Sequence, residues 1–175
     1  MEETTLPAAV LAQLRQTPEI LAKMLEAATE DQMAWKPSAD RWSIGEVLGH
    51  LRHVEQEIYL RRIRQFLEDE DEPRLEAYDQ NACYEAGEYA GAGRDLLKGF
   101  TDRRWHSLAL LYQLPPGSQE RPARHSRFGR LRLDAMLHEW AYHDLGHIRQ
   151  IAELYRTRAF YPAMGPYRDY YTPRP

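Results

Sequence analysis

The chain has 175 residues, a formal net charge of −4 and a single cysteine, Cys83, which suits one domain that buries its core without disulfides. The negative charge argues against a nucleic-acid partner, because binding phosphates requires a basic surface. The amino-terminal sequence MEETTLPAAV lacks the basic start and the apolar run of a signal peptide. No apolar run approaches the roughly 20 residues that cross a bilayer. We therefore expect a cytoplasmic protein with no membrane partner.

A first helix is predicted over about residues 7–29. Its apolar side chains, which include Leu14 and Leu21, recur at helical spacing and define one face. Inside this segment, Thr17 and Pro18 have the form of an N-cap and a first helical position. The sequence therefore predicts a kink or a break at this point.

The second helix has the clearest start, in the sequence RWSIGEVLGHL (41–51). Ser43 and Glu46 have the spacing of a capping box, in which each side chain satisfies a free backbone amide at the start of the helix. We expect the helix to run from about residue 44 to 68. Its apolar face comprises Ile44, Val47, Leu51, Val54 and Ile58.

The rest of the chain predicts two more helices, over about 92–113 and 131–158. A loop over 115–130 joins them, and no segment has the pattern of a convincing strand. We therefore predict an all-α protein, a four-helix bundle formed by residues 1–158. The tail over 159–175 is rich in proline and tyrosine, so we expect it to be irregular and to pack on the domain or on a partner subunit.

The sequence LHEWAYHDLGHIRQI (137–151) places three histidines on the last helix. Because each residue turns a helix by about 100°, His143 and His147 lie about 40° apart, within the apolar arc, and can bind one ion together. His138 points about 140° away from His143. The zinc-protease motif H-E-x-x-H would place a glutamate between two ligands, and Glu139 is not so placed. The pattern therefore argues against such a protease.

A catalytic metal usually takes three protein ligands, so this histidine pair needs a partner from another helix. His50 lies at the edge of the apolar face of the second helix, whereas His53 lies about 60° further toward solvent, which makes His50 the better third ligand. The alternative is that His143 and His147 form a hydrogen-bonded pair in the core without a metal. The remaining histidines are interpreted as ordinary surface or loop residues: His106, His125 and His138.

Taken together, these segments resemble the DinB-like superfamily of metal-binding helical bundles. The matching segments are MAWKP (33–37), WSIGEVLGHLRHVE (42–55), Arg62, RHSRFGRLRLDAML (124–137) and HDLGHIRQI (143–151). The resemblance implies a homodimeric four-helix bundle of DinB type in which His50, His143 and His147 bind one divalent metal ion. Members of the family often have an acidic residue where this chain has His53, so the role of that position is open.

The resemblance also implies the class of chemistry. One possibility is a metal-dependent enzyme acting on a small molecule, either a hydrolase or a transferase that uses a low-molecular-weight thiol. The others are a non-catalytic, stress-associated metal-binding bundle and a structural domain without metal. Zinc suits three imidazoles best, and nickel, iron or manganese also fit such ligands.

Three further polar side chains face inward on the predicted helices: Glu55, Arg62 and Asp144. Because unpaired buried charges are costly, we expect them to satisfy one another. They are interpreted as an ion-pair network or, alternatively, as carboxylates that lie behind the ligands and orient a metal-bound imidazole. The sequence assigns no residue a catalytic role.

Overall fold

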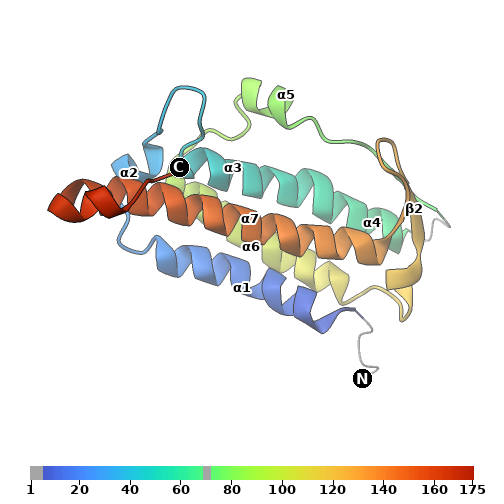
Figure 1. The fold of residues 1–175 in the computed structure, drawn as a ribbon. Helices are drawn as coiled ribbons and strands as arrows, with labels where there is room; N and C mark the ends of the chain where they lie inside the picture. The colour runs from blue at the N-terminus through green and yellow to red at the C-terminus, as the bar shows by residue number, and fades with distance from the viewer. Residues whose placement is uncertain (1–5, 69–71) are drawn as a thin grey trace.

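In the computed structural model, which describes residues 6–68 and 72–175, the chain folds into a lengthwise bundle of helices (Figure 1). The long helical segments are α1 (Ala8–Met24), α3 (Ile44–Val54) with its continuation through η1 (Glu55–Leu60) and α4 (Arg61–Leu67), α6 (Gly93–Leu111) and α7 (Leu133–Ala159). Helices α1 and α3 each pack against both α6 and α7, so α1 and α3 occupy opposite corners. The short helices α2 (Glu30–Ala34) and α5 (Gln80–Glu85) lie in the connections. The prediction of a four-helix bundle is confirmed.

The buried core consists of two apolar clusters with a polar layer between them. On α7, Trp140 and Ile151 belong to different clusters, and the buried Asp144 lies between them in sequence. On α6, the buried Arg104 separates the two clusters in the same way. The bundle therefore carries charged side chains at the middle of its interior.

The start of α3 forms as its sequence predicts. The Ser43 hydroxyl accepts a hydrogen bond from the Glu46 amide at 3.1 Å, and the Glu46 carboxylate accepts one from the Ser43 amide at 2.7 Å. This capping box satisfies two free amides and fixes where the helix begins. The position of His50, two turns further on, follows from that start.

The predicted break at Pro18 is wrong, because α1 continues through it from Ala8 to Met24. Thr17 is not an N-cap: it is buried within the helix, and its hydroxyl donates to the Gln13 carbonyl at 3.0 Å. Proline has no amide hydrogen, so the Leu14 carbonyl one turn earlier loses its helical partner. Arg104 on α6 donates to that carbonyl at 2.9 Å. A tertiary hydrogen bond thus replaces the missing local one.

The helix predicted over 44–68 is helical along this length but not uniformly α-helical. A π-helical segment, η1, occupies Glu55–Leu60 and separates α3 from α4. A π-helix has wider turns, with i→i+5 hydrogen bonds, so residues beyond it lie on a different face from the one that α-helical counting gives. This segment changes the direction of Arg62 relative to Glu55.

A small sheet contradicts the expectation that the connections contain no strand. Strand β1 (Arg74–Leu75) pairs in parallel with β2 (Pro122–His125), which pairs antiparallel with β3 (Gly129–Arg132). Gly129 has a φ of 73°, which a left-handed residue at the end of a tight hairpin requires. In Figure 1 the sheet lies at the end of the bundle where α7 begins.

The tail differs from a wholly irregular segment, since it contains the 3-10 turns η3 (Tyr161–Ala163) and η4 (Gly165–Tyr170). Its tyrosines are largely exposed in the single chain, and Tyr170 has an exposed fraction of 83%. The Arg174 amide donates to the Glu153 carboxylate at 2.8 Å and so fastens the end of the tail to α7. No helix in the described part of the chain combines the length and the apolar character that a membrane span needs.

Candidate metal centre

The three histidines singled out from the sequence meet in the middle of the bundle. His50 comes from α3 and is buried, and His143 and His147 come from α7 and are half-buried. The Nε2 atom of His143 lies 3.1 Å from Nε2 of His50 and 3.2 Å from Nε2 of His147. One nitrogen from each ring can be chosen so that all three lie within 4.8 Å of one another. The structure therefore brings together the predicted set.

The spacing of these nitrogens fits a shared metal ion. Two nitrogens bound tetrahedrally at about 2.0–2.1 Å from zinc are about 3.3 Å apart, close to the distances here. His147 also has its tautomer fixed, because its Nδ1 lies 2.9 Å from the Gln150 amide oxygen, which can only accept. The hydrogen of His147 is then on Nδ1, and Nε2 presents a lone pair to the other two rings.

The electrostatic state of the rings also suits metal binding. Burial, with a smaller effect from the neighbouring His147, lowers the pKa of His50 to about 3. Burial likewise lowers the pKa of His143 well below its ordinary value and lowers the pKa of His147. At neutral pH all three imidazoles are therefore uncharged, which is the state that coordinates a metal.

The local sequence explains why His50 faces this point. The preceding Gly49 lies against the backbone of Tyr89, and a Cβ atom at Gly49 would come within 2.1 Å of the Tyr89 carbonyl oxygen. The Tyr89 ring in turn meets the His50 ring edge-on at 5.2 Å between centroids. Trp42 packs on the same imidazole at 5.2 Å between centroids. An aromatic wall thus holds the ring of His50 toward α7.

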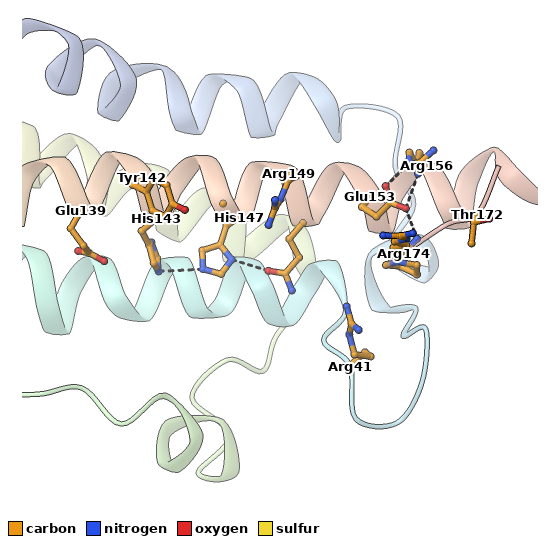
Figure 2. Close-up of a pocket in the computed structure, with 13 residues that line it drawn as sticks. Arg41, Glu139, Tyr142, His143, His147, Arg149, Glu153, Arg156, Thr172 and Arg174 are labelled. Atoms are coloured by element: carbon orange, nitrogen blue, oxygen red, sulfur yellow. Dashed lines mark hydrogen bonds and ion pairs between the residues drawn. The ribbon is translucent and has the colours of Figure 1, made fainter. Parts of the chain in front are cut away.

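Glu139 is a polar residue beside the cluster to which the sequence interpretation gave no role. It lies one helical turn before His143, and Figure 2 shows Glu139, His143 and His147 projecting from α7 toward the same side. The Tyr59 hydroxyl donates to its carboxylate at 3.0 Å. Glu139 as a whole is exposed to solvent, but its carboxyl group is partly desolvated, and this desolvation raises the pKa of the group. The i,i+4 relation to His143 was the signal that could have identified it.

Two cavities reach the histidine cluster, and Glu139 and His143 line both. The larger has a volume of about 740 Å³ and includes His147 in its wall (Figure 2). Its arginines are Arg41, Arg149, Arg156 and Arg174. The smaller, of about 310 Å³, is lined by His50 and by mainly apolar side chains of α3, η1, the sheet and α7. The cluster is therefore accessible to a small molecule.

The buried charges beside the cluster are paired, but not as the sequence predicts. Arg104, fully buried, donates to the Glu55 carboxylate at 2.9 Å and to the Asp144 carboxylate at 2.6 Å. These two carboxylates raise the pKa of Arg104 despite its burial. The expectation that Arg62 pairs with them is wrong, because η1 turns that side chain elsewhere. The apolar residues four before and four after Arg104, Phe100 and Leu108, could have shown that it faces inward.

The remaining histidines differ in their surroundings. His138 is exposed and its Nδ1 lies 2.9 Å from the Asp134 carbonyl, in agreement with its predicted outward direction. His53 lies beside Glu88, with 3.8 Å between ring nitrogen and carboxylate, and does not line either cavity at the cluster. The interpretation of His125 as an ordinary loop residue is wrong, because it is buried in β2.

Comparisons with known proteins found a matching family, a similar sequence and a similar structure. Residues 13–151 match the family model of the DinB superfamily. The uncharacterized protein YuaE of Bacillus subtilis (strain 168) is 26% identical over 141 residues, which cover 74% of this chain and 87% of that protein. The fold is similar to that of YfiT from Bacillus subtilis, which is described as a probable metal-dependent hydrolase with an unusual four-helix bundle topology. The two structures have a TM-score of 0.74 and 21% sequence identity, and the match covers 90% of this chain and 92% of that chain.

Proposed function

This chain belongs to the DinB superfamily, and from that premise we propose that it is a metal-dependent hydrolase of a small molecule. The observation that carries the proposal is the convergence of His50, His143 and His147 beside two cavities. The description of YfiT as a probable metal-dependent hydrolase supports it. Zinc is the ion that three neutral imidazoles suit best, and we propose it first.

The three imidazoles would hold the ion and leave part of its coordination sphere open toward the cavities. When bound, a divalent ion supplies Lewis acidity, which polarises a substrate oxygen and activates water for attack. The histidines themselves stay neutral, and Gln150 keeps the ring of His147 in its orientation. Both α7 ligands sit on one rigid helix, which fixes their separation.

Glu139 is the residue best placed to move the proton. It lines both cavities together with His143, and Tyr59 orients its carboxylate through a hydrogen bond of 3.0 Å. The raised pKa of Glu139 makes it a stronger base than an ordinary glutamate. In the proposed reaction it takes a proton from the attacking water and returns it to the leaving group, so that one water is consumed and the carboxylate is restored.

The test combines metal analysis with hydrolysis of a panel of small esters and amides. We expect one equivalent of divalent metal per chain, and Glu139→Gln should lower kcat by about 10²–10⁴-fold with metal content unchanged. The matched control is Glu57→Gln, which removes an exposed carboxylate of η1 that lines neither cavity at the histidine cluster, and it should leave kcat unchanged. Absence of metal, or full activity in Glu139→Gln, would contradict the proposal.

A further inference from the structure

Arg62 is a cation that has no carboxylate partner in the described part of the chain. It is half-buried in the wall of the smaller cavity, and its Nη2 donates to the Glu76 carbonyl at 2.9 Å. Among the described residues, no carboxylate lies within ion-pair distance of its guanidinium, and Glu139 acts on it only from further away. Burial lowers the pKa of Arg62, as expected for a cation whose charge is poorly compensated. Burying such a cation is energetically unfavourable unless an anion pairs with it.

His125 lies directly beside this arginine. Its ring is buried, with a residue exposure of 6%, and its Nε2 lies 3.1 Å from Arg62 Nη2. The other ring nitrogen, Nδ1, accepts hydrogen bonds from the amides of Arg127 at 3.1 Å and Phe128 at 3.3 Å. The hairpin between β2 and β3 therefore holds the ring and requires a lone pair on Nδ1.

This arrangement determines where the hydrogen of His125 lies. A neutral imidazole has one hydrogen, and with a lone pair on Nδ1 the hydrogen must be on Nε2. The Nε2–H group then faces the Nη2–H group of Arg62, so two donors lie 3.1 Å apart with no acceptor between them. The opposite tautomer would instead place a hydrogen against two backbone amides. Both groups are satisfied when an oxygen of a ligand accepts from them together.

The donor pair lies in the same cavity as the metal centre. Arg62 and His125 are part of its wall, as are His50 and His143. The surface that completes this cavity is mainly apolar: Val54, Ile58, Leu75, Leu131, Ala135 and Met136. The cavity, at about 310 Å³, matches the lower range of small-ligand pockets. A single compartment thus combines an oxyanion site, an apolar wall and the proposed reaction centre.

We propose that Arg62 and His125 bind the carboxylate of an apolar small-molecule substrate, whose cleavable bond then reaches the histidine centre. This inference rests on the proposed hydrolase function and names its substrate class. A carboxylate carries one negative charge and two acceptor oxygens, which suit one guanidinium and one neighbouring N–H donor. The apolar wall would hold the hydrocarbon part of the molecule.

The test measures binding without catalysis, on the full-length protein after dialysis against a chelator. The probes are 3-phenylpropanoate and its neutral amide, 3-phenylpropanamide, which differ in the group offered to the donor pair. By isothermal titration calorimetry we expect the carboxylate to bind roughly tenfold or more tightly than the amide. Arg62→Gln should remove this preference, and His125→Phe should reduce it. Arg61→Gln, which removes an exposed charge one residue away, should retain it.

Equal affinity for the two probes in the unaltered protein would overturn the inference, and so would a loss of preference in Arg61→Gln as large as in Arg62→Gln. The comparison of probes needs no variant, so it stands even if a substitution prevents folding. Carboxylate preference without hydrolysis in the metal-loaded protein would uphold this site and contradict the proposed function. Hydrolysis without carboxylate preference would do the reverse.

Discussion

Two polar clusters occupy the same middle layer of the bundle and differ in how they are satisfied. Around Arg104, every N–H group of the guanidinium has an acceptor, supplied by Glu55, Asp144 and the Leu14 carbonyl. The rings of Phe100 and Trp140 cover its faces at 4.9 and 5.0 Å. This cluster links all four corners of the bundle through one side chain.

Around the histidines the opposite holds. The three Nε2 atoms face one another, and among the described residues no oxygen atom forms a hydrogen bond with any of them. In the same part of the chain, Nδ1 of both His50 and His143 is buried without a hydrogen-bond partner. A buried polar group that lacks a partner is costly, so this cluster is incomplete in a way that the arginine cluster is not. The comparison supports the proposal that the first cluster stabilises the fold and the second binds a ligand.

The strongest test of this distinction is Arg104→Met. Removing the guanidinium leaves two buried carboxylates and the Leu14 carbonyl without a donor, so we expect the free energy of unfolding to fall by about 3–5 kcal/mol. Urea denaturation followed by circular dichroism would measure it. Arg103→Met, which removes the neighbouring arginine and its hydrogen bond to Gln56, should cost roughly 1 kcal/mol or less. Equal effects of the two changes would mean that the buried cluster has no special structural role.

The histidine cluster should respond to substitution in binding rather than in folding. We expect His50→Ala, His143→Ala or His147→Ala to weaken metal affinity by more than about 100-fold, since loss of a ligand should exceed loss of an outer partner. His138→Ala should retain full affinity, because that side chain leaves α7 on another face. Competition with a chromogenic chelator would measure all four. Metal loss in His138→Ala alone would contradict the site.

Acid should distinguish the clusters as well. The pKa of His50 is about 3 in the folded protein against about 6.5 in an unfolded chain, so only the unfolded state gains a proton between these values. In the metal-free protein, the stabilisation that follows from this difference in the pKa of His50 is present in full above pH ~6.5. It decreases as the pH falls, so the free energy of unfolding should be lower by about 2 kcal/mol at pH 5. Urea denaturation at pH 7.5 and 5 should show a shallower loss in His50→Asn. The same loss in both proteins would refute this assignment.

The smallest expected effect on metal affinity concerns Gln150, which contacts the proposed metal ligand His147. Gln150→Leu removes the acceptor for Nδ1–H of His147, so the ring loses its preferred tautomer and orientation. We expect metal affinity to fall by roughly tenfold. Gln150→Glu retains an acceptor at this position and should restore most of the affinity in the same chelator competition. Unchanged affinity in Gln150→Leu would show that packing alone orients the ring.

The features that the sequence predicts correctly are those encoded within a few residues. The capping box at Ser43 and Glu46 depends on residues three apart, and the shared face of His143 and His147 depends on residues four apart. Helical geometry fixes both without knowledge of the rest of the chain. This local information was enough to select the candidate ligands on α7 and to place His138 outside the site.

Other features depend on contacts between distant segments, and local sequence patterns offer no means of choosing among these contacts. Arg104, rather than Arg62, pairs with Glu55 because α6 and η1 pack together and the π-helical turns redirect Arg62. The short strands form because β1 and the 122–132 hairpin meet at the end of the bundle, although their arginine-rich sequence lacks a strong strand pattern.

By itself, then, the sequence determined the long helical segments, the start of α3 and the shared face of His143 and His147, since these follow from hydrogen bonds and side-chain spacing within one or two turns. Only the tertiary structure decided which faces meet. It brought His50 to the α7 pair, surrounded Arg104 with acceptors from three other segments and set His125 beside Arg62. These pairings join residues far apart in the chain, and their free energy depends on burial and on the exact set of neighbours that packing supplies.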